Sequence, residues 1–141
     1  MDLDAYVAAH RHEWARLEAL LGPNAHLFGR MDDARLRWLY ANCAGVVGAA
    51  YEDFGLTPLE AAAFAKPVAV LRSGGYLDTV VDGVTGVFFD EPLPSAVAAA
   101  VQDMVGRRWS NLELVAHAER FGEARFIERM QAIVAEESLL A

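Results

Sequence analysis

Residues 51 to 67, with the sequence YEDFGLTPLEAAAFAKP, constrain the fold of this chain more than any other stretch. They follow Gly45–Ala49, an apolar run that is typical of a buried strand, and they begin with a short glycine-containing loop. Thr57, Pro58 and Glu60 then match the N-cap, the first and the third positions of a helix, which is the T-x-x-E capping box with proline where its missing N–H does no harm. The stretch therefore predicts a strand, a loop and a helix that begins at about Thr57.

The first turn of this helix is predicted to face an anion. Its free backbone N–H groups and its dipole would point beyond the preceding strand, into the ligand crevice of an open α/β sheet. Glu52 would hang over the strand end while Glu60 rises from the helix start, so that the two carboxylates flank the crevice. This arrangement suits the hydroxyls of two sugars joined by a diphosphate. Each charge-assisted bond to a hydroxyl contributes about 1.5–3 kcal/mol, and the helix terminus adds about 0.3–1 kcal/mol.

The rest of the chain alternates predicted helices and strands, which is typical of a parallel α/β architecture. The predicted strands are His26–Phe28, Gly45–Ala49, Val68–Leu71 and Gly86–Phe89. The predicted helices are about Asp4–Leu21, a helix from Asp32 or Asp33 to about Cys43, a helix that begins at Thr57, Leu77–Val81, Ser95–Val105, Asn111–Arg120 and Glu123–Glu137. In the second of these helices Leu36, Leu39 and Tyr40 are expected to be buried. We therefore expect an α/β fold with a parallel sheet of about four strands flanked by helices. The last helices would form a tail over about residues 110–138 of a single domain, 1–141.

Composition limits the possible partners. With 141 residues, 55% of them apolar, the chain is long enough for one domain with a hydrophobic core. Its net charge of −8 argues against nucleic acid or an anionic membrane as a partner. No apolar run approaches the roughly 18 residues of a membrane span, and the first residues do not resemble a signal peptide, so a cytoplasmic protein without an integral membrane segment is expected. The four histidines lack metal-ligand spacing and Cys43 is the only cysteine, so no metal is predicted. Ser73-Gly74-Gly75 lacks the G-x-G-x-x-G pattern and a P-loop lysine, so no cofactor is predicted.

An ordered series of motifs indicates a family. In chain order they are Glu52-x7-Glu60 with Phe54-Gly55-Leu56 inside it, Lys66-Pro67-Val68-Ala69-Val70, Gly74-Gly75 and Asp82-Gly83-Val84-Thr85-Gly86. Over about residues 15 to 105 the chain resembles the C-terminal, donor-binding domain of retaining nucleotide-sugar glycosyltransferases with two Rossmann-like domains, the glycosyl transferases group 1. The form Tyr-Glu-Asp-Phe-Gly is similar to the mannosyltransferase-like members. The resemblance implies a Rossmann-like sheet.

The resemblance also implies roles for individual residues. Glu52 would hold the donor sugar and Glu60 the nucleotide ribose. Backbone contacts to sugar and diphosphate would come from Phe54, Gly55, Leu56 and Thr57. Gly74 and Gly75 would line the donor crevice, although a loop that needs positive φ explains them equally well. Arg30, at the end of the first predicted strand, would approach the nucleobase, with a solvated arginine as the alternative.

The implied function is transfer of a sugar, with mannose as the candidate, from a nucleoside diphosphate sugar to an acceptor, without a metal or a covalent intermediate. Since the family's basic pair and N-terminal acceptor domain are not encoded, we expect the isolated chain to be inactive or weakly active. One alternative is a non-catalytic nucleotide-sugar binding module or pseudoenzyme subunit. Another is an interaction domain in which the glutamates are structural.

The sequence departs from the family pattern at two places near the motif. Gly48-Ala49 replaces the usual Pro-Ser before the first glutamate. Ala65 replaces the usual glycine before Lys66-Pro67, and a left-handed alanine would cost about 1–2 kcal/mol, which favours a different helix end.

The predicted sheet is also incomplete relative to the family domain. Two of the family's strands, which would lie between the strand at Leu27 and the strand at Val46, are missing, and buried sheet edges need partners. Either Leu27–Phe28 pairs directly with the Val46 strand, or another chain completes the sheet, or residues 1–141 are part of a longer protein. We favour the last.

Overall fold

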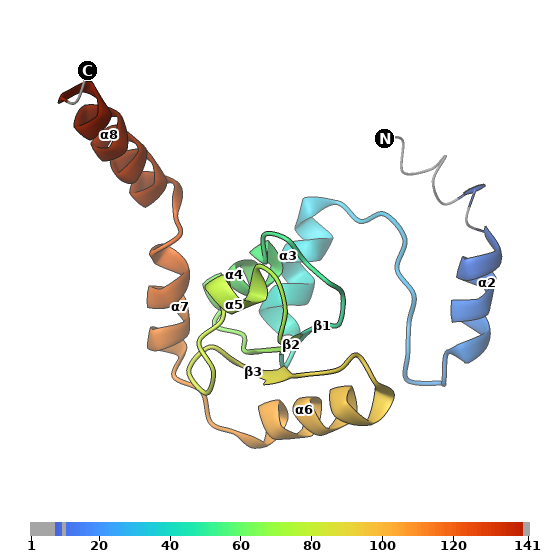
Figure 1. The fold of residues 1–141 in the computed structure, drawn as a ribbon. Coiled ribbons are helices and arrows are strands. Elements are labelled where there is room, and N and C mark those ends of the chain that lie inside the picture. Colours follow the sequence, from blue (N-terminus) through green and yellow to red (C-terminus); the bar gives the residue numbers. More distant parts are fainter. Residues whose placement is uncertain (1–7, 10, 140–141) are drawn as a thin grey trace. The chain divides into compact units, whose positions relative to one another are not determined.

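A computed structural model describes residues 8–9 and 11–139, with side chains up to residue 136 (Figure 1). The chain divides into two compact units, Met1–Arg37 and Trp38–Ala141, and the second unit contains the sheet. The prediction of one domain over residues 1–141 is not tested by this division and stays a prediction.

The first unit is helical and irregular. Helix α2 runs over Arg11–Leu20, and the earlier part of the predicted helix, which was to begin at Asp4, lies mostly outside the described residues. The predicted strand His26–Phe28 does not form. A strand of three residues depends on a neighbouring strand for its hydrogen bonds, and no described residue supplies one here. The prediction of four strands was therefore wrong by this one strand.

Helix α3, Asp33–Asn42, begins as the sequence predicts. The carboxylate of Asp32 accepts a hydrogen bond from the backbone N–H of Arg35 at 2.8 Å, so Asp32 is the N-cap. This bond satisfies one of the donors that the first helical turn leaves free.

The second unit is built on three parallel strands in the order β1-β2-β3. Strand β1 is Val46–Gly48, β2 is Val68–Leu71 and β3 is Gly86–Phe89. All four residues of β2 are buried, because strands lie on both sides of it and helices cover it. Strand β1 pairs only with β2 among the described residues, so the predicted alternative in which Leu27–Phe28 pairs with it is wrong. The other edge of β1 is unpaired in the described part of the chain.

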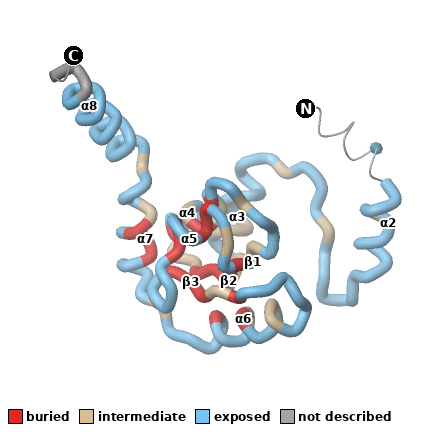
Figure 2. The backbone as a smooth tube through the Cα atoms, viewed as in Figure 1, coloured by how far each residue is buried: buried red, intermediate tan, exposed pale blue. Residues whose placement is uncertain are grey.

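The helices of the second unit lie where the sequence predicts them, within one or two residues. They are α4 at Leu56–Ala63, α5 at Tyr76–Thr79, α6 at Pro94–Gly106, α7 at Asn111–Glu119 and α8 at Glu123–Leu139. Helix α6 packs against β2 and β3, and α4 packs against β1, α5 and α7. Figure 2 shows the buried residues on the strands and on parts of α4 to α7. The largest fully buried side chains are Leu71, Leu114, Val68 and Val70, and each such burial stabilises the fold by about 1.5–3 kcal/mol.

Helix α4 ends in a Schellman motif despite having alanine at the critical position. The N–H of Lys66 donates to the carbonyl of Ala61, and the N–H of Ala65 donates to the carbonyl of Ala62, both at 2.9 Å. Ala65 takes the left-handed conformation with φ 56°. The expectation that alanine favours a different helix end was wrong, because the two capping bonds outweigh the strain at this residue.

Candidate functional site

The start of α4 differs from its prediction. The helix begins at Leu56, its N-cap is Gly55 with φ 68°, and no side chain caps it. Thr57 is therefore the second helical residue rather than the N-cap, and the predicted capping box does not form. The left-handed turn at Gly55, which glycine adopts without steric cost, moves the N-cap two residues earlier, from Thr57 to Gly55.

Two loops lock together at the carboxyl ends of β1 and β2. The N–H of Gly75, in the loop after β2, donates to the carbonyl oxygen of Glu52, in the loop after β1, at 2.7 Å. A Cβ atom at Gly55 would lie 2.6 Å from the carbonyl oxygen of Gly75, and one at Gly74 would collide with the carbonyl oxygen of Glu52. No side chain fits in this contact. The glycines that the sequence indicated after β2 are therefore required by the loop that carries Glu52.

The carboxylate of Glu52 lies close to the buried end of the sheet. Its side chain is half-buried, and its Oε1 is 3.4 Å from the N–H of Phe54. Burial, and after it the negative charge of Glu52, raises the pKa of Tyr76. A Cβ atom at Gly48 would lie 2.6 Å from the Tyr76 hydroxyl, so the buried Tyr76 requires glycine at this position.

The first turn of helix α4 is partly exposed to solvent. Pro58 is buried, whereas the side chains of Phe54 and Leu56 are 76% and 60% exposed. Neither apolar side chain is packed over the helix start. The backbone N–H groups of Leu56 and Thr57 belong to the first turn, where intrahelical acceptors are absent. An anion placed there would meet free donors and the positive end of the helix dipole.

Glu60 projects from α4 toward helix α3. Its Oε2 accepts a hydrogen bond from the Tyr40 hydroxyl at 2.7 Å. Burial is the main cause that raises the pKa of Tyr40, and the hydrogen bond and charge of Glu60 add to it. The sequence placed Tyr40 only as a buried helix residue. A contact between residues 20 apart, on different helices, leaves no periodic signal by which to find it.

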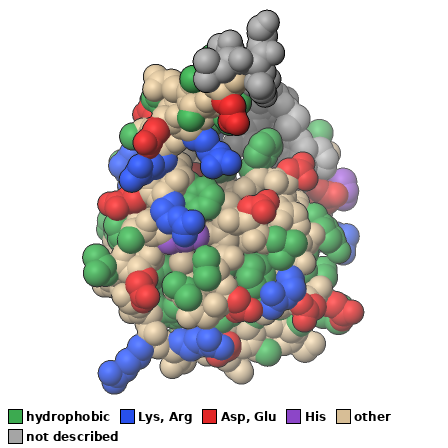
Figure 3. Space-filling view, turned by 60° about the vertical axis from the view of Figure 1, so that its left-hand side comes forward, with side chains coloured by type: hydrophobic (Ala, Val, Ile, Leu, Met, Phe, Trp, Pro, Cys, Tyr) green, Lys and Arg blue, Asp and Glu red, His purple; other side chains and the backbone are tan. Residues whose placement is uncertain are grey.

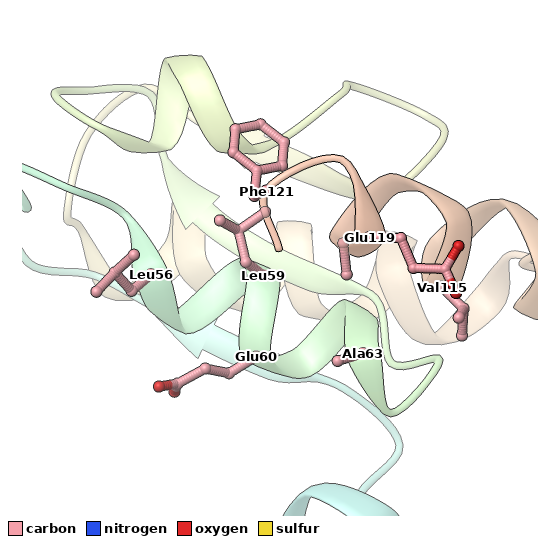
Figure 4. A pocket seen from close by; sticks show the side chains of 8 residues that line it. Leu56, Leu59, Glu60, Ala63, Val115, Glu119 and Phe121 are labelled. Carbon is pink, nitrogen blue, oxygen red and sulfur yellow. The ribbon is translucent and has the colours of Figure 1, made fainter. Parts of the chain in front are cut away.

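A shallow groove of about 520 Å³ lies between α4 and α7 (Figure 4). It is lined mainly by apolar side chains, from Leu56, Leu59, Glu60, Ala63, Val115, Ala118, Glu119 and Phe121. In Figure 4, Leu59 points toward Phe121, whereas Glu60 extends from the other side of α4. Of the predicted site residues, Leu56 and Glu60 line this groove, whereas Glu52, Gly74 and Gly75 do not.

Arg30 belongs to the first unit of the chain. It lines a surface hollow with its neighbours from Met31 to Ala34. Its approach to a nucleobase stays a prediction.

Surface charge on the face in Figure 3 is mixed. Acidic, basic and hydrophobic side chains alternate there, without the dense basic field of a nucleic-acid binding surface. None of the helices in the described residues combines the length and apolar character required to cross a bilayer.

A parallel sheet with interlocked loops at the carboxyl ends of adjacent strands, and with a helix start beside them, is a Rossmann-like arrangement. The comparison with known protein families identifies one family for this chain. The chain belongs to the family Glycosyl transferases group 1, whose model matches residues 11–124. It is thus a partial donor-binding domain of this glycosyltransferase family, as the motifs predicted.

Individual relatives agree with this assignment. The chain is 42% identical over 57 residues to the alpha-1,3/1,6-mannosyltransferase ALG2 of Dictyostelium discoideum. The aligned region covers 40% of this chain and 14% of that protein. Its fold is similar to that of sucrose-phosphate synthase from Thermosynechococcus elongatus, with a TM-score of 0.77 and 24% identity. It is also similar to that of HepE from Anabaena, solved in complex with UDP and glucose, with a TM-score of 0.64 and 22% identity.

These two solved structures each cover 94% of this chain, which in turn spans 35% and 37% of theirs. The chain therefore matches about a third of the length of the solved relatives and less of the mannosyltransferase.

Proposed function

We propose that this chain binds the nucleoside diphosphate sugar for a retaining glycosyltransferase, which transfers the sugar to an acceptor. The observation that carries the proposal is the locked contact between the Glu52 loop and Gly74–Gly75, beside the open first turn of α4. Rigid loops at the carboxyl ends of parallel strands hold binding groups in fixed positions, which reduces the entropy lost when a ligand binds.

Each part of the site has a proposed role. Glu52 accepts hydrogen bonds from hydroxyls of the donor sugar, while the N–H groups of Leu56 and Thr57 bind the diphosphate. Glu60 binds the ribose. The backbone of Phe54 and Gly55 contributes to the sugar and phosphate contacts, and Gly74 and Gly75 form the opposite wall. The net charge of −8 does not oppose this binding strongly, because a helix start acts on an anion at short range.

Mannose is the sugar that we propose. The Tyr-Glu-Asp-Phe-Gly motif resembles mannosyltransferase-like members, and the Dictyostelium relative carries that activity in its name. The HepE structure, solved with UDP and glucose, supports a nucleoside diphosphate sugar as the class of ligand.

Transfer of the sugar also needs an acceptor and groups that neutralise the diphosphate. In this proposal an acceptor domain, or another chain that completes the sheet at the free edge of β1, provides the acceptor and the basic groups that neutralise the diphosphate. The isolated chain would then bind donor with little or no turnover.

The test is a thermal-shift panel of UDP-, GDP- and ADP-sugars. At a concentration of 100 times the dissociation constant, a bound donor stabilises the fold by about 2.7 kcal/mol. We expect one nucleotide sugar to raise the melting temperature of the wild-type chain and to lose this effect in Glu52→Ala. Asp53→Ala, which removes the neighbouring exposed carboxylate, is the matched control and should retain the shift. The proposed function is rejected if no donor shifts the wild type, or if Glu52→Ala shifts equally.

A further inference from the structure

Helices α3 and α4 are joined by one hydrogen bond whose acceptor is a proposed ligand-binding group. The Tyr40 hydroxyl donates to Oε2 of Glu60 at 2.7 Å. Glu60 is exposed, whereas Tyr40 is half-buried and packs against the hydrophobic core. A core-anchored side chain therefore holds a carboxylate that otherwise stands in solvent.

The ring of Tyr40 is fixed by a second contact. It stacks on the ring of Phe64, with centroids 5.6 Å apart and planes inclined by 14°. Phe64 follows Glu60 by four residues and is the C-cap of α4. The tyrosine thus makes two contacts with the α4 segment, through its hydroxyl with Glu60 and through its ring with the C-cap Phe64. The stacked ring holds the hydroxyl beside Glu60.

A glutamate on a helix surface has several rotamers, and binding a ligand would immobilise it at an entropic cost. The bond from Tyr40 removes much of that freedom before any ligand arrives. It uses Oε2, so Oε1 keeps its full capacity to accept hydrogen bonds from a ligand. A tyrosine hydroxyl is protonated at neutral pH and so acts as a donor. Burial of Tyr40, and after it the bond to Glu60, raises the pKa of the phenol further.

We propose that Tyr40 is a positioning residue, which holds Glu60 in the rotamer that accepts hydrogen bonds from the ribose hydroxyls of the donor nucleotide. Tyr40 thereby sets the preference of the site for ribonucleotides over their deoxy forms. The inference rests on the proposed function, because it requires a nucleotide at Glu60.

A purely structural role makes a different prediction. If the bond only tied α3 to α4, removing it would lower stability and weaken all nucleotides equally. The affinity for the ribonucleotide relative to its dideoxy form distinguishes the two roles. Only the loss of Glu60 positioning would weaken the ribonucleotide more than the dideoxy form.

The experiment is calorimetric titration of the 141-residue chain with UDP, GDP and ADP. The nucleotide that binds most tightly is then compared with its 2′,3′-dideoxy form. The variants are Tyr40→Phe, Glu60→Gln and the double variant. Tyr51→Phe, which removes the hydroxyl of an exposed tyrosine, is the matched control.

We expect Tyr40→Phe to weaken the ribonucleotide by about twofold to tenfold, the factor for immobilising one flexible side chain, and to leave the dideoxy form unchanged. The double variant should bind no more weakly than Glu60→Gln, because Tyr40 acts only through Glu60. Tyr51→Phe should keep the wild-type preference. If Tyr40→Phe does not fold, Phe64→Leu, which loosens the ring but keeps the hydroxyl, should reduce the same preference.

Two other results have distinct meanings. If the wild type binds no nucleotide, the proposed function itself fails. If it binds nucleotide, and Glu60→Gln loses the preference for ribose while Tyr40→Phe keeps it, the donor site stands and the role of Tyr40 is overturned.

Discussion

Gly75 donates its N–H to the carbonyl of Glu52 at 2.7 Å, which fixes the loop after β2 against the loop that carries the proposed sugar-binding carboxylate. The space between the two loops admits only hydrogen atoms at Gly74 and Gly75. The position of Glu52 therefore depends on two residues that would never touch the ligand through side chains.

The first prediction concerns this contact. Gly74→Ala should destabilise the fold by at least about 2 kcal/mol, since the residue has φ 53° and a Cβ atom would collide with the carbonyl of Glu52. Urea unfolding measures the effect. Gly106→Ala is the control, because nothing lies within 4 Å of a Cβ atom there, and its stability should equal or slightly exceed that of the wild type. Equal stability of both variants would contradict the locked-loop geometry.

The second prediction concerns the end of α4. Ala65→Gly should stabilise the chain by about 0.5 kcal/mol, because relief of the left-handed strain at φ 56° exceeds the entropy that glycine adds to the unfolded chain. The melting temperature, measured by circular dichroism, should rise by about 2 °C. In contrast, Ala62→Gly, in the same helix, should lower it, since glycine costs about 0.5–1 kcal/mol inside a helix. A lower melting temperature for Ala65→Gly would contradict the Schellman end.

The third prediction concerns Gly48 and Tyr76. Gly48→Ala should destabilise the fold by about 1–3 kcal/mol, because the new methyl group would lie 2.6 Å from the Tyr76 hydroxyl. In a Tyr76→Phe background, which removes that oxygen, the same substitution should cost less. A double-mutant cycle by chemical denaturation measures the coupling, and strict additivity would show that the two residues do not collide.

The fourth prediction concerns alkaline pH. The unfolded chain loses the Tyr40 proton near pH 10, whereas the folded chain keeps it to higher pH because burial and Glu60 raise the pKa of this group. Above about pH 10 the folded state therefore binds more protons than the unfolded state, and the stability that Tyr40 contributes is lost as pH rises. The unfolding free energy of the wild type should fall more between pH 8 and pH 11 than that of Tyr40→Phe. Tyr76 titrates in both proteins and cancels from the comparison. Parallel pH profiles would contradict the environment assigned to Tyr40.

The sequence predicts the second unit well because its signals are local. Val68–Leu71 and Gly86–Phe89 are strands with the predicted bounds, and the run of small and apolar residues around Val46 predicts β1. Asp32 caps α3 because its side chain and the N–H that it binds are only three residues apart.

The errors arise where the deciding contact is distant along the chain. The T-x-x-E pattern at Thr57 predicted a capping box, but Gly55 packs on Gly75 and starts the helix earlier. His26–Phe28 has a strand-like sequence and no strand to pair with among the described residues. Tyr40 binds Glu60 across 20 residues of sequence. Pairing between separate elements decides each of these cases, and a local pattern does not encode it.

The unpaired side of β1 limits what can complete the sheet. Val46–Gly48 has only three residues, so a strand that joined it would gain few backbone hydrogen bonds. Val47, at 44% exposure, is the more exposed of the two valines on this strand. Backbone recognition alone is too weak for a lasting association here, and this brevity also discourages indiscriminate stacking of one copy on another. A partner that pairs with this edge of β1 must therefore also supply side chains that pack over the strand.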